Sequence, residues 1–294
     1  MYNLLIRTAL IDAVFFKKSE DIRMKRLFAL LLVLATTLLL TACGNKKSGG
    51  TLVVGMECDY RPFNWTETTD TESNVPIENV PGAYADGYDV QVAKTIAKEL
   101  NLDLKIKAIA WDGLIPALQA GEIDLIIAGM SPTEERKTTI DFTSAYYRST
   151  HVILLKSDSQ YANAKVLDDF RGANTIGQLG TIYADLSAQL ATHGAVQGTN
   201  LDTVPQIVNA ILRGTVDVTV LEEPVAIGIC AQYGNELTYI TPTDGFDVSE
   251  EDVVVSIGVR KGYNLTSDIN NVLNNVLTQE MRNTLMLNAT KSGE

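Results

Sequence analysis

Two short segments of the sequence resemble each other, and together they limit the folds that this chain can adopt. They are Ala117–Asp124 (ALQAGEID) and Ala210–Asp217 (AILRGTVD). Each pattern predicts the end of a helix, a glycine that closes it, and an apolar residue with an Asp that open a strand. A match of this length also fits chance or a common helix–turn–strand habit. As a repeat, it predicts two α/β lobes built on one plan.

The first half of the chain alternates between strand-like and helix-like segments. Strands are predicted at Thr51–Met56, 102–108 and 123–128, and helices after a capping Asp89 and at Asp112–Ala120. We expect residues 57–87 to be a long loop, because they are rich in Thr, Asn, Pro and Gly. This alternation predicts parallel α/β layers, in which ligands bind beyond the carboxyl ends of the strands. Two such lobes facing each other would form a cleft.

The N-terminal part of the sequence predicts export. From Met24 onward, MKRLFALLLVLATTLLLTACG has a charged start, a short apolar core and an ending similar to a bacterial lipoprotein cleavage box. We therefore expect residues 24–42 to be a signal peptide, Cys43 to carry lipid, and residues 43–50 to form a polar tether. Residues 1–23 are interpreted as a mis-assigned extension. The alternative is a signal anchor that happens to end in Cys.

Charge and cysteine content narrow the function classes. From Cys43 on, the chain has 18 basic and 33 acidic residues, a net charge of −15, which argues against nucleic acid as a partner. Cys58 and Cys230 have no His or second Cys at metal-ligand spacing, so no metal site is expected. An extracytoplasmic compartment permits a disulfide between them, and free thiols fit the sequence at least as well.

The stretch IIAGMSPTEERKTTIDF, residues 126–142, places an arginine where a helix does not favour one. An apolar run ends at Ala128, and Ser131, followed by Pro and Glu, predicts the start of a short helix. Arg136 then lies in the first turn, where the helix already carries partial positive charge. This arrangement suits a bound anion, above all a carboxylate that takes a two-pronged guanidinium contact. The alternative is a solvated surface arginine.

With these residues in view, the chain resembles the extracytoplasmic amino-acid-binding proteins of ABC importers for polar amino acids. The resemblance starts at Thr51 and is carried by GMECDYRPFNW (55–65), GYDVQVAKTIAKEL (87–100), WDGLIPALQAGEIDLIIAGMSPTEERKTTIDFTSAYY (111–147), IGQLGTIYADL (176–186) and VDVTVLEEP (216–224). One departure is Gln91, where the family has an acidic residue.

The resemblance implies a two-lobe periplasmic-binding-protein fold of type II. This is an α/β fold with two hinge crossovers and a ligand cleft between the lobes. Lobe 1 would comprise residues 51–148 plus 251–294, and lobe 2 would comprise residues 149–250. Closure around the ligand would be a hinge motion.

The resemblance also assigns the contacts to the carboxylate end of an amino acid. Arg136 matches the residue that clamps the α-carboxylate, and Gly129 and Ser131 match positions that hold the head group. The helix start at Thr181 and Ile182 would offer backbone amides to the same carboxylate. The alternatives are structural roles without ligand contact: a helix cap at Ser131 and a glycine turn before Thr181.

The remaining expected contacts concern the α-ammonium and the side chain. Glu222 stands where many members have Asp for the ammonium, and its side chain is one methylene longer. Tyr60 and Trp111 match positions whose rings sandwich the ligand side chain, Glu57 matches an acidic position near its tip, and Gln178 lines the other wall. The alternatives are core packing for the rings and a surface carboxylate for Glu222. A carboxylate between two rings favours a cationic tip.

The sequence therefore predicts a substrate-binding lipoprotein that captures a free polar amino acid and delivers it to an ABC permease and its ATPase subunits. Arginine or lysine is favoured, with glutamine or histidine next. We expect a monomer without catalytic residues or cofactors, anchored to the outer face of the cell membrane (periplasmic if the envelope has two membranes). The alternatives are an enzyme with similar lobes, of dehydratase or lytic type, and a sensory ligand-binding module. His151 and His193 lie in no Ser-His-Asp spacing.

Overall fold

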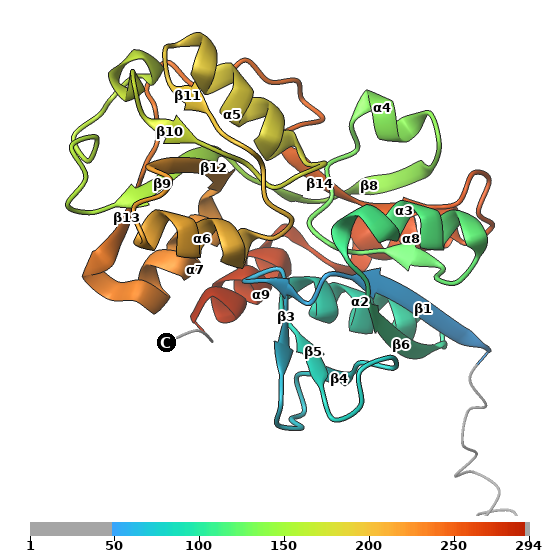
Figure 1. Ribbon diagram of the computed structural model, residues 1–294. Helices are drawn as coiled ribbons and strands as arrows, with labels where there is room; N and C mark the ends of the chain where they lie inside the picture. Colours follow the sequence, from blue (N-terminus) through green and yellow to red (C-terminus); the bar gives the residue numbers. More distant parts are fainter. Residues whose placement is uncertain (1–48, 292–294) are drawn as a thin grey trace, which may run out of the picture. The chain divides into compact units, whose positions relative to one another are not determined.

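The computed structural model describes residues 49–291, which belong to one compact unit of the chain. Within them, two five-stranded sheets and one four-stranded sheet are packed against helices (Figure 1). The predicted N-terminal extension, the signal peptide and the lipidated Cys43 lie outside the described residues, as does most of the tether.

The first sheet has the strand order β6-β1-β7-β14-β8. Its strands are β1 (Thr51–Met56), β6 (Asp103–Ala108), β7 (Leu125–Ile126), β8 (Asp141–Arg148) and β14 (Val254–Val259). β1 pairs in parallel with β6 and β7, whereas β14 runs antiparallel to β7 and β8. The prediction of parallel layers is thus wrong at β14, because this strand returns from the second sheet rather than through a crossover helix.

The second sheet has the strand order β11-β10-β12-β9-β13. Its strands are β9 (His151–Lys156), β10 (Asn174–Thr175), β11 (Val196–Gln197), β12 (Val218–Glu222) and β13 (Leu237–Ile240). β10 is parallel to β11 and β12, and β9 is antiparallel to β12 and β13. Both sheets therefore carry their one antiparallel strand in the fourth place.

The two similar sequence segments occupy equivalent places in these sheets. Ala117–Asp124 leads from helix α3 (Trp111–Ala120) into β7, and Ala210–Asp217 leads from helix α6 (Val204–Leu212) into β12. β7 and β12 are each the third strand of their sheet. Gly121 and Gly214 follow the two helices with φ of 77° and 70°, a conformation that glycine adopts without strain. The prediction of two lobes built on one plan is confirmed.

The other helices of the described chain lie around the two sheets, and most of them pack against a sheet (Figure 1). They are α2 (Tyr88–Glu99), α4 (Glu134–Lys137), α5 (Ile182–Thr192), α7 (Glu223–Tyr233), α8 (Thr266–Asn271) and α9 (Gln279–Lys291), with a π-helical turn at Val272–Val276 and 3-10 turns at Leu167–Phe170 and Gly234–Glu236. Apolar residues at helical spacing explain the packing of α2, whose Val92, Ala93 and Ile96 are all buried.

The segment predicted as a long loop forms a small sheet instead. It has the order β2-β3-β5-β4, with β2 at Asp59–Tyr60, β3 at Asn64–Glu67, β4 at Val75–Pro76 and β5 at Tyr84–Asp86. Strands of two to four residues are too short to show an alternating pattern, which is why turn-forming residues dominated the prediction. The predicted strand 123–128 likewise shrinks to β7.

Two predicted helix caps are wrong. The cap of α2 is Gly87, and Asp89 lies in the first turn with its side chain fully buried. The cap of α4 is Thr133, whose hydroxyl accepts from the amide of Arg136, and Ser131 precedes it as a buried residue. In both cases the sequence pattern was right about a helix start and wrong by two residues about the cap.

Two connections join the lobes. Ser149 and Thr150 lie between β8 and β9, and residues 241–253 lie between β13 and β14. The amide of Ser149 donates to the carbonyl of Val253 at 3.0 Å, so the two connections run side by side. The predicted lobe boundaries fall within these connections and stay a prediction. In the described part of the chain, no helix combines the length and apolar character that a membrane span requires.

Candidate functional site

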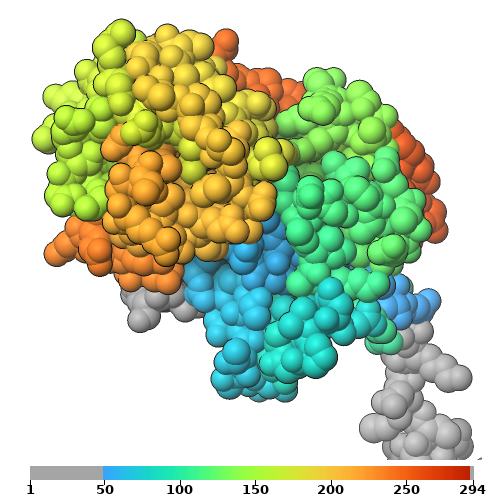
Figure 2. Space-filling model, viewed as in Figure 1, coloured from blue at the N-terminus to red at the C-terminus, as the bar shows by residue number. Residues whose placement is uncertain are grey.

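A cavity of about 660 Å³ lies where the two lobes meet. Segments of the first lobe and of the second line it: Glu57, Asp59, Ala108, Ile109, Ala110, Trp111, Asp112, Ile115, Met130 and Arg136 from the first, and Leu179, Gly180, Asp202 and Thr203 from the second. Figure 2 shows the meeting of the two surfaces, one yellow to orange and the other blue to green. The cavity is therefore built by the carboxyl ends of strands from two sheets, as open α/β sheets favour.

Arg136 occupies one side of this cavity. Its guanidinium donates to the carbonyl of Ser131 at 2.8 Å and, across the cleft, to the carbonyl of Gly180 at 3.2 Å. It also lies over the ring of Trp111, 5.1 Å from the ring centroid, and the indole N–H donates to the same Gly180 carbonyl at 2.9 Å. Burial lowers the pKa of Arg136 from its usual value. The guanidinium is held in place by groups of both lobes.

The amino end of α5 faces Arg136. Thr181 caps this helix, and its hydroxyl accepts from the amide of Tyr183 at 3.2 Å. Thr181 and Ile182 are both buried. Because the first amides of a helix point outward with partial positive charge, this end and the Arg136 guanidinium form one positive region.

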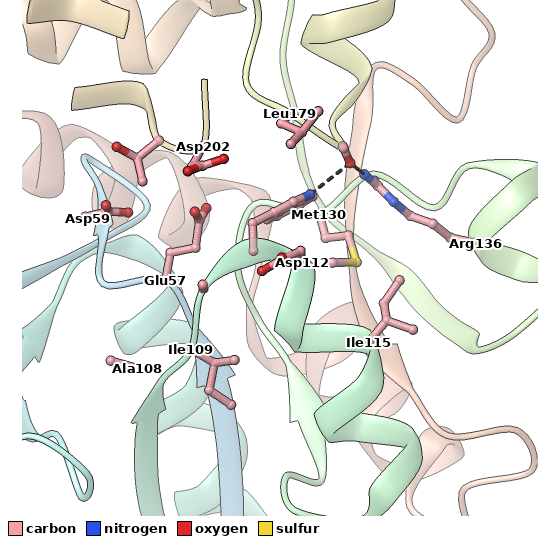
Figure 3. A pocket seen from close by; sticks show the side chains of 14 residues that line it. Glu57, Asp59, Ala108, Ile109, Asp112, Ile115, Met130, Arg136, Leu179 and Asp202 are labelled. Atoms are coloured by element: carbon pink, nitrogen blue, oxygen red, sulfur yellow. Dashed lines mark hydrogen bonds between the residues drawn. The ribbon is translucent and has the colours of Figure 1, made fainter. Parts of the chain in front are cut away.

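Glu57 lies on the opposite side, among other carboxylates. Figure 3 shows Glu57, Asp59 and Asp202 together on one side of the pocket and Arg136 on the other. Gln178 crosses the cleft to donate to Glu57 at 2.9 Å. Desolvation, and then the charge of Asp59, raise the pKa of Glu57 to about 8. A cation placed here would restore the ionised form, because opposite charge favours it.

Glu222 is buried behind the cavity, with only 2% of its surface exposed. The hydroxyl of Tyr60, from the first lobe, donates to its carboxylate, and the hydroxyl of Tyr183, from the second lobe, is hydrogen-bonded to it as well. Burial raises the pKa of Glu222 to about 7, against the opposing effect of these two hydroxyls. A carboxylate in this position is a ready partner for a positive group that enters the cleft.

The structure groups the residues predicted from the sequence into two sets. Glu57, Trp111 and Arg136 line the cavity directly. The other predicted residues lie behind these three. Gln178 is hydrogen-bonded to Glu57, Ser131 to Arg136, and Tyr60 to Glu222. Thr181 caps α5, Ile182 is buried in the same helix, and Gly129 packs against Tyr60.

Tyr60 lies differently from the sandwich that was expected. It is not among the residues lining the cavity; its ring stacks on Phe63 at 5.6 Å between centroids, with an interplanar angle of 8°. Gly129, with φ of 63°, packs against the same ring, and a Cβ at this glycine would lie 3.1 Å from it. The hydroxyl of Tyr60 makes the contact with Glu222. The Tyr60 ring therefore holds this hydroxyl in place and does not face the cavity.

Sequence reasoning missed four residues of the site: Tyr183, Asp59, Asp112 and Asp202. Tyr183 was within reach of inference, because it lies in the same helical turn as Thr181 and Ile182. The three aspartates come from separate segments, and no local pattern connects them. In the part of the chain that the structure describes, the cavity lining thus contains four carboxylates and one guanidinium.

One question left open by the sequence, whether the two cysteines form a disulfide, is answered for the described residues. Cys58 and Cys230 are free thiols, and Cys58 is buried. Burial raises the pKa of Cys58 to about 12, which makes it a poor nucleophile. Among residues 49–291, no group of His, Cys, Asp and Glu has the arrangement of a metal site.

Comparison with known proteins places this site in context. The sequence profile of the bacterial extracellular solute-binding proteins, family 3, matches residues 52–286. The arginine-binding extracellular protein ArtP of Bacillus subtilis is 29% identical over 255 residues, which cover 85% of this chain and 92% of ArtP.

Two solved structures extend the comparison. An ancestral arginine-binding protein bound to arginine is 30% identical, with a TM-score of 0.66, covering 82% of this chain and 98% of that one. An amino acid ABC transporter substrate-binding protein from Streptococcus pneumoniae, bound to L-arginine, is 26% identical, with a TM-score of 0.69 and coverage of 84% and 95%.

Proposed function

Because this chain belongs to the bacterial extracellular solute-binding proteins, family 3, we propose that it is the substrate-binding component of an ABC importer for a cationic amino acid. It captures the free amino acid in the cleft, closes around it, and delivers it to a permease driven by ATPase subunits. Arginine or lysine is the favoured ligand, and glutamine or histidine comes next. The names of the relatives, an arginine-binding protein of Bacillus subtilis among them, support this assignment.

The distribution of charge in the cavity is the observation that carries the proposal. Arg136 and the amino end of α5 lie at one side, and Glu57, Asp59, Asp112 and Asp202 supply carboxylates to the rest of the lining. An amino acid with a cationic side chain matches this layout, because its carboxylate meets the positive region and its tip meets the carboxylates. An acidic amino acid would place its side chain among like charges and be excluded.

The proposed roles follow from this orientation. Arg136 and the amides at Thr181 and Ile182 hold the α-carboxylate, with Gly129 and Ser131 shaping the loop beneath it. Glu222 receives the α-ammonium. Each of these charged groups is desolvated at the closed cleft, so each needs its partner on the ligand. The first lobe supplies Arg136, and the second lobe supplies Glu222 and the amino end of α5, so the complete site needs both lobes.

The side chain of the ligand lies along the remaining wall. Trp111, 5.1 Å from the Arg136 guanidinium, bounds the pocket, and Glu57 with its Gln178 partner faces the tip of the ligand. A guanidinium or ammonium between an indole ring and a carboxylate gains both cation–π and ionic attraction.

We further propose that the protein performs no covalent chemistry and acts as a monomer held by lipid on Cys43 at the outer face of the cell membrane. The relatives named above are binding proteins, which supports the first point. The buried, unreactive Cys58 supports it as well. The family is extracellular by description, which supports the location.

A thermal-shift screen against the twenty amino acids tests the proposal. The protein is first stripped of ligand by unfolding and refolding, because ligand that binds only the native state raises the melting temperature. We expect the largest shift with L-arginine or L-lysine. A shift with glutamine alone would refute the charge argument, and no shift with any amino acid would refute the ligand class.

A further inference from the structure

We propose that Tyr183 is a positioning residue for the ligand's α-ammonium: it orients the Glu222 carboxylate within the second lobe, and Tyr60 completes the arrangement from the first lobe. The inference deepens the proposed function and rests on it. It explains how this chain uses a glutamate, one methylene longer than aspartate, at the ammonium position.

The Glu222 carboxylate accepts hydrogen bonds from its own backbone amide and from two tyrosine hydroxyls. Glu222 is the last residue of β12 and precedes α7, yet its side chain makes no capping hydrogen bond to that helix. The strand pairs it in register with His151 of β9, which fixes its backbone. The carboxylate is buried, and the hydroxyls of Tyr60 and Tyr183 are its neighbours.

Both tyrosine rings are themselves fixed. Tyr183 is 5% exposed, sits in the first turn of α5, and meets the ring of His151 edge-on at 6.0 Å between centroids. Tyr60 is also 5% exposed and stacks on Phe63. Since neither ring is free to swing away, each hydroxyl is aimed at the carboxylate, and the long Glu222 side chain is held in one arrangement.

The hydrogen-bond inventory leaves room for the ligand. A phenol donates one hydrogen bond, and an ionised carboxylate offers about four lone-pair directions. The two hydroxyls and the backbone amide of Glu222 itself occupy three of these directions, so about one direction remains for an ammonium. Hydrogen bonds to the ionised form also keep a buried carboxylate charged, because they oppose the effect of desolvation. Without them Glu222 would take up a proton more readily and would lose its attraction for the ammonium.

Other charged and titratable groups face this cluster from the surrounding elements. After the larger effect of burial, Asp89 of α2 also raises the pKa of Glu222. Burial and the Glu222 charge raise the pKa of Tyr183, and Arg136 of α4 opposes this rise. The hydroxyl of Tyr147 on β8 has its own pKa raised by the Glu222 charge, after the larger effect of burial. His151 lies against Tyr183 with its pKa lowered by burial. Only Tyr60 and Tyr183 contact the carboxylate by hydrogen bonds among the described side chains.

The two tyrosines differ in the lobe to which they belong. Tyr183 and Glu222 are in the same lobe, so their contact exists whether or not the lobes are closed. Tyr60 is in the other lobe, so its contact is made on closure. Removing the Tyr183 hydroxyl should therefore weaken both capture and retention of the ligand, whereas removing that of Tyr60 should mainly speed dissociation.

The experiment compares Tyr183→Phe, Tyr60→Phe and the matched control Tyr161→Phe by isothermal titration and stopped-flow fluorescence. Tyr161 is a buried tyrosine of the second lobe whose hydroxyl donates to the Arg171 carbonyl, away from the site. The probes are L-arginine and 5-guanidinopentanoate, which is arginine without its α-ammonium. A lost hydrogen bond to a charged group corresponds to about 10- to 100-fold in affinity.

We expect Tyr183→Phe to weaken L-arginine by this factor, to leave 5-guanidinopentanoate unchanged, and to move the midpoint of the pH profile of L-arginine binding upward. The Tyr161→Phe control should do none of these. Equal loss for both probes would overturn the inference, as would unchanged L-arginine binding. If Tyr183→Phe does not fold, Tyr60→Phe is measured with the same two probes. Equal dissociation rates of L-arginine from the wild type and from Tyr60→Phe would then refute the inference. Failure of the wild-type protein to bind either L-arginine or L-lysine would instead refute the proposed function.

Discussion

The charge of Glu57 offers a quantitative test of how the pocket distinguishes ligands. L-Arginine and L-citrulline have the same length and shape, but citrulline ends in a neutral urea group. Arginine requires an ionised Glu57, and citrulline does not. Their affinity ratio therefore isolates the interaction at the side-chain tip, because contacts to the common α-carboxylate and α-ammonium cancel.

The pH dependence of this ratio follows from the raised pKa of Glu57. With a pKa of about 8, Glu57 is mostly protonated at pH 6 and mostly ionised at pH 9. Each pH unit below the pKa adds about 1.4 kcal/mol to the cost of ionising it. The preference for arginine is thus nearly complete at pH 9 and is lost as the pH falls through about 8. Between pH 9 and pH 6 the ratio should fall about 90-fold, by the same relation.

The assay is isothermal titration of both ligands at pH 6, 7, 8 and 9, in wild type and in Glu57→Gln. The variant should lose the pH dependence of the ratio and bind the two ligands more equally. Glu67→Gln is the control, because Glu67 pairs with Arg61 and is not among the cavity-lining residues. A ratio that is flat in the wild type, or equally steep in Glu57→Gln, would refute the argument that Glu57 faces the side-chain tip.

Three further predictions concern the rest of the site. Arg136→Ala should lower the affinity for every amino acid about 100-fold or more in titration, because it leaves the ligand's buried α-carboxylate unpaired. Equal affinity in wild type and variant would refute the assignment of Arg136 to the α-carboxylate. Asp89→Asn should lower both the melting temperature and the affinity, because the carboxylate accepts from Asn64 at 2.8 Å and Tyr146 at 2.7 Å and so supports the loop at Gly129. Thiol labelling of the native protein should leave Cys58 unmodified until denaturant is added, and rapid labelling would contradict its burial.

Local patterns in the sequence were sufficient for much of the fold. The bounds of β1 match the prediction, Gly121 ends α3, and Thr181 caps α5, because each depends on residues adjacent in the chain. The small sheet between β1 and α2 was not predictable in the same way. Its strands are too short for a periodic signal, and their pairing depends on partners up to 21 residues away, as with Trp65 and Asp86.

The candidate site shows the same division. Arg136 stood out because its place in a helix start is locally unfavourable. Tyr60 and Glu222 lie 162 residues apart, and nothing near either residue announces that a hydroxyl meets a carboxylate. Asp59, Asp112 and Asp202 line one cavity for the same reason, since their three distant segments converge only when both lobes are folded. The sequence was enough to select Arg136, Tyr60 and Glu222 as candidates. It was not enough to predict which side chain each of them contacts.

The pairing of Glu222 with His151 bears on the order of events during capture. His151 is the first residue after a connection between the lobes. The residue that follows Glu222, Glu223, donates its amide to the carbonyl of Thr150 in that connection at 3.0 Å. Groups beside a rotation axis travel least when a body turns. We therefore expect the ammonium subsite to stay almost stationary as the lobes rotate. The ammonium can then bind at this subsite first, and the rest of the cleft closes around the ligand afterwards. Substitutions at Ser149 or Thr150 would then alter how long the ligand stays without touching it.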